Sequence, residues 1–589
     1  MKIKMLQRTK ADYIVYFGNV FYSLIIFLLI TAQISQVAGP VIMPDETGYW
    51  ATGAYLAGYD WSGVMKMSPY YGYGYGLFLG IIMYIFHDPV VMFKAAVILN
   101  GIIMITIFWV TFSILSMLKD EWDGRFRGFL SFVVTLYTFN IYYALNSEAE
   151  ILQVFIFLLL CKFILQSCRT RKSFEIRMIF ISLLAVYMVA CHQRNIGIVL
   201  SLSICIFLAL LFKKISILSF FTYVVLLGIS IFFFLKFKEI VNENIFLVSG
   251  YTAEEAGKVS GALGIFTLKG LKSFFECFLG RFFYLGCVTF LLVYRGLAVI
   301  IRDFLIGFKK KKYKKDKLII FEIFIGMTLF GEIAIGSLAF LGNERRIDGF
   351  LYGRYNEHIV IPILLLGFIS FRKIKENLKV QLLCSTILLI LGIYMNHVYL
   401  SYNTLETSTH SISAIIGMPI FQNVTENSIQ NVYSLGVAQF CLLVSWLIYF
   451  FLSSIQWKMT IIGGMLTVLF WTSFGINALH RYFYDFTEYN EDLYSFAKKV
   501  QDAVDIDTQL YYLFDKEKEA VEPTSSTWLM YRIQFFLPQN RIDVIDIDEF
   551  KQQEYVLVYK SSQENEIVSK MDYEQLAEGE RMILYCIEK

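Results

Sequence analysis

Charged residues are scarce in this chain of 589 residues, since only 17% are Asp, Glu, Lys or Arg and 57% are hydrophobic. A soluble domain keeps about a quarter of its residues charged. A chain this apolar must bury most of its surface in lipid, which excludes an ordinary soluble protein. The net charge of +3 is also too small to indicate a nucleic-acid partner.

Metal-binding and disulfide patterns are missing as well. The nine cysteines form no CxxC pair and no Cys/His ligand spacing, so neither a zinc site nor a disulfide framework is indicated. Most of them lie within apolar runs: Cys161, Cys191, Cys205, Cys287, Cys384 and Cys441. We expect them to be small core side chains. The sequence indicates no cofactor and no metal.

Long apolar runs are abundant. A membrane-spanning helix needs about 20 mostly apolar residues. By that measure we predict about thirteen spans. They lie near 13–38, 89–118, 128–146, 149–167, 177–192, 196–212, 215–236, 282–307, 318–341, 358–371, 379–397, 434–455 and 457–477. The first run is too long for a signal-peptide core and lacks a cleavage site. Segment 76–86 is apolar but too short to cross, which predicts a helix lying in the membrane interface.

Lysine and arginine in the short loops predict the orientation. The N-terminal tail is basic, and so are the loops 119–127, 169–177, 213–214, 309–317 and 372–379. A cytoplasmic N-terminus places all these loops inside the cell. The opposite loops are 39–88, 142–148, 237–281, 342–357 and 398–433. An odd number of spans then places the C-terminal end outside, so we predict a multi-pass protein of the cell membrane.

The tail changes character at about residue 482. Its runs 509–514, 541–547, 555–560 and 582–588 alternate as half-buried strands do, and the stretches 491–504 and 527–537 are helix-like. We therefore predict a transmembrane domain over 1–481 and a small extracytoplasmic α/β domain over 482–589. That domain shows no glycine-rich phosphate loop and no catalytic triad. Its expected role is to support or cover a site at the membrane.

An acidic pair opens the first outer loop, where Asp45 and Glu46 follow the outer end of the first span. One carboxylate could act as a general base that deprotonates an acceptor, because partial burial brings a carboxyl pKa nearer to neutral pH. The same pair also suits the first turn of a helix, so a plain helix cap remains open. Tyr49 and Tyr70 follow in the same loop and are candidates for substrate binding.

Further polar groups lie on the same predicted face of the membrane. They are Lys66 in the first outer loop, Glu148 in the turn 146–150, Arg194 in the turn 192–195, Arg346 in 343–346, and Arg354, Tyr355 and Glu357 in 352–358. Arginine suits bidentate phosphate binding, and a lysine can hold a lipid-linked phosphate. Each residue also has an ordinary alternative as a headgroup contact, a short polar turn or an intrahelical pair. Their shared location is the stronger signal.

The order of these motifs resembles a known group of enzymes. Asp45-Glu46 after the first span, the segment SPYYGYGYGLFLGIIMYIFHDP and the span that follows are similar to the GT-C superfamily of membrane glycosyltransferases. More narrowly, the chain resembles bacterial relatives of protein O-mannosyltransferase and of the lipid A aminoarabinose transferase. The turns at Glu148 and Arg194 also resemble that family. Where some relatives carry a second acidic residue before the lysine, this sequence has Val64 and Met65.

The resemblance implies transfer of a sugar from a polyprenyl-phosphate donor to a glycan, lipid or protein acceptor of the cell envelope, on the outer face of the membrane. It assigns Asp45 as the base and Glu46 as a supporting carboxylate. It makes Lys66, Arg194 and Arg354 candidates for the lipid phosphate. Some relatives use a divalent metal, whereas this sequence offers no clear ligand cluster.

Two other classes of function remain open. A transporter or flippase of lipid-linked glycans would show internal repeats and polar groups near the middle of the membrane. The sequence shows no repeat between its halves, and its polar groups gather at one surface. A scaffold protein would need no one-sided set of carboxylates and arginines. The enzyme is therefore the favoured interpretation.

Overall fold

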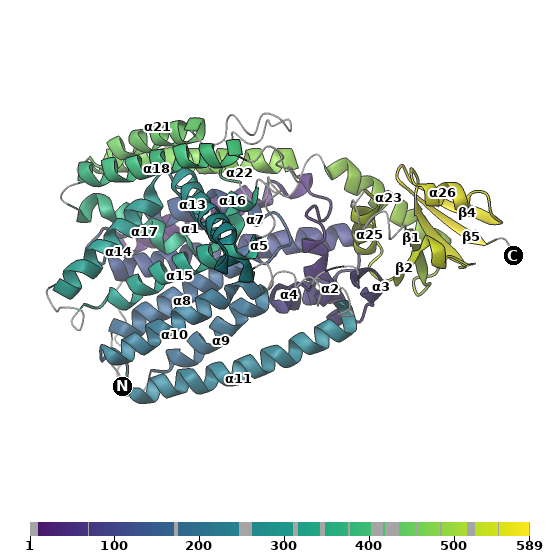
Figure 1. The fold of residues 1–589 in the computed structure, drawn as a ribbon, viewed down its shortest axis with the longest axis horizontal. Coiled ribbons are helices and arrows are strands. Elements are labelled where there is room, and N and C mark those ends of the chain that lie inside the picture. The colour runs from purple at the N-terminus through teal and green to yellow at the C-terminus, as the bar shows by residue number, and fades with distance from the viewer. Residues whose placement is uncertain are drawn as a thin grey trace.

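Helices make up most of the chain, and a five-stranded sheet lies at one end of an elongated molecule (Figure 1). The computed structural model describes residues 10–66, 68, 70–169, 175–246, 262–309, 316–341, 348–374, 377–401, 416–418, 435–454, 456–482, 486–514, 525–551 and 553–587.

The helices before the tail follow one another through the first 482 residues. They are α1 (Lys10–Thr31), α2 (Asp45–Ala57), α3 (Ser62–Met65), α4 (Tyr73–Ile85), α5 (Pro89–Leu118), α6 (Gly124–Thr135), α7 (Thr138–Tyr143), α8 (Glu150–Arg169), α9 (Arg177–Cys191), α10 (Ile196–Leu211), α11 (Ile217–Val241), α13 (Leu268–Val288), α14 (Leu292–Lys309), α15 (Ile319–Ala339), α16 (Asp348–Leu351), α17 (Ile361–Lys373), α18 (Asn377–Ser401), α21 (Leu435–Leu452) and α22 (Trp457–Tyr482). Short 3₁₀ turns, η2 (Gln193–Asn195), η5 (Gly353–Tyr355) and η6 (Glu357–Ile359), precede α10 and α17.

The prediction of a helical, multi-pass membrane protein is confirmed. Nine helices among the described residues are long and apolar enough to cross a membrane, and a tenth span results if the bent pair α13–α14 counts as one. The nine are α1, α5, α8, α10, α11, α15, α18, α21 and α22. The predicted number of about thirteen exceeds this. Segment 76–86 forms part of the 13-residue helix α4, and its place in the interface stays a prediction.

The four other predicted spans are short or broken helices. Segment 128–146 divides into α6 and α7, while α9 has 15 residues and α17 has 13. Segment 282–307 crosses the 110° bend between α13 and α14. Average hydropathy does not detect such breaks, because apolar residues form the turns as well as the helices.

The bend between α13 and α14 is covered by protein. Phe290 and Leu291 adopt φ values of 49° and 67° there, in the left-handed region that side chains rarely enter. The indole N–H of Trp471 donates to the carbonyl of Val288 at 2.9 Å, which satisfies a carbonyl at the break. Irregular backbone at membrane depth requires such partners, since lipid offers none.

The tail forms the predicted small α/β unit. It contains α23 (Thr487–Ala503), β1 (Leu510–Phe514), α25 (Ser525–Phe536), β2 (Ile542–Asp546), β3 (Tyr555–Tyr559), α26 (Gln563–Val568), β4 (Tyr573–Glu578) and β5 (Met582–Ile587). The strand order is β2-β1-β3-β5-β4, with β1 parallel to β2 and β3, and β5 antiparallel to β3 and β4. Strand β4 was not predicted. The proposed domain boundary at 481/482 falls at the end of α22.

Helices α23 and α25 lie between the sheet and the helical body (Figure 1). Helix α25 contacts α2, α3 and α5, and β2 contacts α3. The ring of Phe535 on α25 meets Trp50 of α2 at 5.3 Å between centroids. The tail therefore rests on the segment that carries the acidic pair.

Candidate active site

Arg354 lies at the centre of a buried cluster of charged side chains. Its Nη1 is 2.6 Å from Asp45 Oδ2, its Nε is 2.7 Å from Glu150 Oε1, and its Nη2 contacts Glu148. The side chains of Arg354, Glu148 and Glu150 are at most 3% exposed, whereas that of Asp45 is 20% exposed. Asp45 is therefore the most exposed of the three carboxylates and the one best placed to meet a substrate.

Asp45 begins α2, and a tyrosine fixes its orientation. Tyr71 OH donates to Asp45 Oδ1 at 2.8 Å, while Arg354 holds the other oxygen. The Tyr71 ring approaches over Gly48, one turn along α2, where an added Cβ would lie 2.1 Å from the ring. A larger residue than glycine at position 48 would therefore push Tyr71 away from the carboxylate.

Glu46 has a different role because it is fully buried and all its contacts are internal. Its Oε1 accepts from the backbone N–H groups of Val41 and Ile42 at 2.8 and 2.9 Å. Its Oε2 accepts from the N–H and hydroxyl of Ser147 at 2.7 and 2.6 Å. Burial raises the pKa of Glu46, and these hydrogen bonds lower it. Glu46 thus joins the first outer loop to the turn that carries Glu148.

Arg194 meets the same cluster from η2. Its Nη2 is 3.2 Å from Glu150 Oε1, and its guanidinium stacks on the ring of Tyr355 at 4.5 Å. Arg194 is 9% exposed, and its Nε and Nη1 have no hydrogen-bond partner among the described residues. Buried polar groups are normally satisfied, so these two N–H groups point to a ligand or ordered water.

The pKa of Glu148 is raised well above its ordinary value. Burial is the main cause and outweighs Arg354, which lowers the pKa, while the neighbouring carboxylates of Glu150 and Asp45 raise it further. The ring of Tyr143 also lies 5.8 Å from the Arg354 guanidinium. A buried charge is tolerated only when it is paired, so the cluster depends on Arg354.

Glu357 and Tyr49, two further predicted site residues, are both buried. The Glu357 carboxylate accepts hydrogen bonds from Tyr137 OH at 2.6 Å and Tyr284 OH at 3.0 Å, so it joins three segments of the helical body. Tyr49 is fully buried, its ring contacts Tyr71, and its hydroxyl has no hydrogen-bond partner within the described part of the chain.

Lys66 and Tyr70 contact other parts of the chain. Lys66 Nζ donates to the carbonyl of Val544 in β2 at 3.2 Å, which is a contact with the tail. The Tyr70 ring packs against Phe246, and Lys238 Nζ lies 5.1 Å from its centre. Arg346 lies outside the described residues.

The cluster also contains Tyr71, Ser147 and Glu150, which were not among the predicted site residues. All three lie in motifs that were noted for neighbouring residues, Tyr71 in the first outer loop and the other two in the turn 146–150. Nothing local identified Ser147 as the partner of Glu46. No metal-ligand cluster of three or more His, Cys, Asp or Glu occurs among the described residues, and the absence of a metal stays a prediction.

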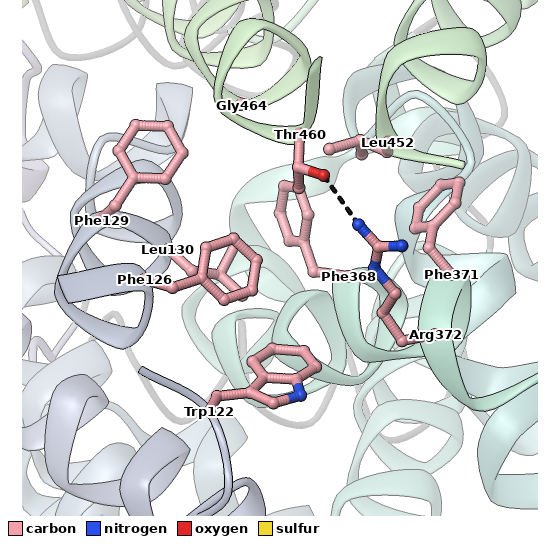
Figure 2. A pocket seen from close by; sticks show the side chains of 10 residues that line it. All are labelled: Trp122, Phe126, Phe129, Leu130, Phe368, Phe371, Arg372, Leu452, Thr460 and Gly464. Carbon is pink, nitrogen blue, oxygen red and sulfur yellow. Dashed lines mark hydrogen bonds between the residues drawn. The ribbon is translucent and has the colours of Figure 1, made fainter. Parts of the chain in front are cut away.

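A small hollow elsewhere in the helical body involves none of these residues. It has a volume of 10 Å³ and is lined by Trp122, Phe126, Phe129, Leu130, Phe368, Phe371, Arg372, Leu452, Thr460 and Gly464 (Figure 2). Arg372 Nη2 donates to Thr460 Oγ1 at 2.9 Å across it. A space of this size holds about one water molecule, so it is no substrate site.

Comparisons with known proteins extend this description. No family model and no curated protein matches the chain. Solved structures that match the chain include ArnT from Cupriavidus metallidurans in the apo state and the same protein bound to undecaprenyl phosphate. The chain has the fold of ArnT. Each match covers 98% of both chains with a TM-score of 0.54 and 12% identity. The predicted resemblance in fold to a GT-C transferase is thereby confirmed, while an identity this low assigns no residue a role.

The burial of Glu357 predicts how the stability of the protein depends on pH. Burial raises the pKa of Glu357 from 4.5 to about 7. The folded state therefore holds a proton that the unfolded chain releases, and stability is lost as pH rises from about 4.5 to 7. We expect Glu357→Gln to remove this loss of about 3 kcal/mol. Thermal unfolding of both proteins in detergent at several pH values measures it. Parallel pH profiles for the two proteins would contradict it.

Proposed function

We propose that the protein is a glycosyltransferase that moves a sugar from a polyprenyl-phosphate donor to an acceptor on the outer face of the membrane. The observation that carries this proposal is the part-exposed carboxylate of Asp45, held by Arg354 and Tyr71 above a buried charged cluster. The fold of ArnT supports it, because one of the matching structures contains undecaprenyl phosphate. A cytoplasmic N-terminus and an extracytoplasmic tail are part of the same proposal.

In the proposed reaction Asp45 takes the proton from an acceptor hydroxyl or amine as that atom attacks the anomeric carbon. The bond from this carbon to the phosphate oxygen breaks, and polyprenyl phosphate leaves with the bonding electrons. A single displacement inverts the anomeric centre and requires one base. Tyr71 donates to one oxygen of Asp45 and Arg354 to the other, so the carboxylate is held in one orientation toward the acceptor.

Arg194 is the favoured group for the leaving phosphate. Arg354 has its three nitrogens engaged by carboxylates, whereas Arg194 has two N–H nitrogens without partners among the described residues. A guanidinium edge of this kind suits a phosphate, whose charge grows as it leaves. Arg354 then serves to position Asp45. Lys66 would need to leave Val544 before it could bind the donor.

A binding measurement tests this assignment. We expect Arg194→Gln to weaken binding of polyprenyl phosphate by about 10- to 100-fold, the value of a charge-assisted hydrogen bond. Titration of the purified protein with the lipid, followed by a thermal shift or by native mass spectrometry, measures the change. Arg177→Gln is the matched control, since Arg177 pairs with Glu175 in a predicted cytoplasmic loop. Equal affinities for the two variants would exclude Arg194 from the phosphate site.

The activity itself is tested with purified protein and a panel of polyprenyl-phosphate sugars, together with crude envelope acceptor. Release of polyprenyl phosphate, followed by mass spectrometry, is expected for one donor and only when acceptor is present. That result would name the sugar. No release with any donor, together with movement of a lipid-linked glycan across reconstituted vesicles, would instead establish a transporter.

A further inference from the structure

The loop that leads into Asp45 is held by two helices of the tail. Thr487 Oγ1 on α23 donates to the carbonyl of Gln36 at 2.9 Å, and Asn490 Nδ2 donates to that of Pro40 at 3.2 Å. The Phe536 ring of α25 covers Gly39, where an added Cβ would lie 2.7 Å from it. The contacts therefore follow the loop over 36–40, just before the acidic pair.

Arg532 of α25 makes the contact nearest to the acidic pair. Its Nη2 donates to the carbonyl of Val41 at 3.0 Å, and its Nη1 lies 3.4 Å from Asn490 Oδ1. The guanidinium lies 4.5 and 4.8 Å from the ring centres of Phe486 and Tyr489. At 3% exposure, stacked and hydrogen-bonded, Arg532 has little freedom to move.

Val41 is thereby fixed from both sides. Its carbonyl accepts from Arg532, while its N–H donates to Glu46 at 2.8 Å. Glu46 is the neighbour of Asp45 in the first turn of α2, and its other oxygen is bound by Ser147. A continuous chain of hydrogen bonds thus runs from the tail, through Val41 and Glu46, to the turn beside Glu148.

We propose that Arg532 is a positioning residue for Asp45, through which the tail holds the first turn of α2 in the orientation needed for transfer. The tail is then a structural part of the active site that contributes no reacting group. Transfer requires the reacting atoms within a fraction of an ångström of their productive positions, and a 1 Å displacement can cost about 100-fold in rate. The inference rests on the proposed function.

Arg532→Met tests it, because methionine keeps much of the apolar stem and removes the donors. The matched control is Arg581→Met. Arg581 also stacks on Tyr489, at 4.3 Å, but its ion pairs are with Asp492 and Glu580 in the tail. Arg532→Lys is the conservative variant, because lysine keeps the positive charge and can still donate a hydrogen bond to the carbonyl of Val41.

The first readout is hydrogen exchange in the peptide that covers 36–46, which needs no activity. We expect Arg532→Met to speed exchange of the Val41 and Ile42 amides by about 5- to 100-fold, as expected when a buried hydrogen bond is lost. Arg581→Met is expected to leave it unchanged. Equal exchange in wild type and Arg532→Met, or equal acceleration by both variants, would overturn the proposal.

The second readout separates kcat from KM. We expect Arg532→Met to lower kcat by about 10- to 100-fold with little change in KM for the donor, because the phosphate contacts of Arg194 remain. Arg532→Lys is expected to recover part of the rate. A change in KM alone, or faster exchange with normal kcat, would overturn the positioning role. If wild type releases no polyprenyl phosphate from any donor, the proposed function fails and hydrogen exchange still decides whether Arg532 holds the loop.

Discussion

Asp45→Asn is expected to lower sugar transfer by about 10²- to 10⁴-fold, the contribution of a positioned general base. Asparagine has nearly the same shape, and its carbonyl oxygen can accept one of the two hydrogen bonds that Tyr71 and Arg354 donate to separate oxygens of Asp45, but it cannot take a proton. The fall should therefore appear in kcat, with donor affinity little changed. Release of polyprenyl phosphate in single-turnover and steady-state assays measures both.

Glu46→Gln is the control for the acidic pair. Its carbonyl oxygen can keep one pair of the hydrogen bonds that Glu46 accepts, so some loss of stability is expected. The pH dependence of the remaining transfer should stay that of wild type. If transfer survives Asp45→Asn and is abolished by Glu46→Gln or Glu148→Gln, the base lies elsewhere in the cluster.

Arg354→Met is expected to destabilise the protein by about 3–5 kcal/mol, because it leaves the buried Glu148 without its arginine partner and leaves Glu150 with Arg194 alone. Glu148 and Glu150 are fully buried and both contact Arg354. The thermal unfolding temperature in detergent, measured with the fraction of protein that elutes as a single species, reports the loss.

Removing negative charge should restore stability to this variant. We expect the double variant Arg354→Met with Glu148→Gln to recover a large part of the lost stability, since the number of unpaired buried charges falls. It should not recover transfer, because Asp45 still lacks its positioning partner. Arg354→Met as stable as wild type would contradict the structural role given to Arg354, and so would a double variant that is less stable than the single one.

Fold class was accessible from the sequence because it depends on averages along the chain. Lipid-facing helices require long apolar runs, and the sheet of the tail requires alternation. Strand β4 was missed since it is the edge of the sheet, where Glu574 and Gln575 are exposed and little alternation is needed. The segments α6–α7 and α13–α14 are broken, but they were predicted as continuous spans because apolar residues also form the turns between their helices.

The sequence predicted that several polar groups share one face, but not which of them contact one another. Charge and loop position brought Asp45, Arg194 and Arg354 together on one face. The contact between Asp45 and Arg354 joins residues 309 positions apart, and no local pattern encodes it. The sequence analysis also treated Asp45 and Glu46 as one acidic pair, although successive side chains on a helix point about 100° apart. Asp45 therefore faces the accessible side of the cluster while Glu46 is directed into the protein.

The hydrogen bonds around Asp45 also set an order for assembly. The ribosome makes Asp45 early. The other two carboxylates of the cluster, Glu148 and Glu150, follow about a hundred residues later, Arg354, which contacts all three, later still, and Arg532 near the end of the chain. Arg194, which pairs with Glu150, is made soon after it, whereas the arginine that contacts Asp45 and Glu148 is made only after more than half of the chain. A nascent or truncated chain holds the acidic pair without the groups that orient it, so complete synthesis is a condition for an ordered site.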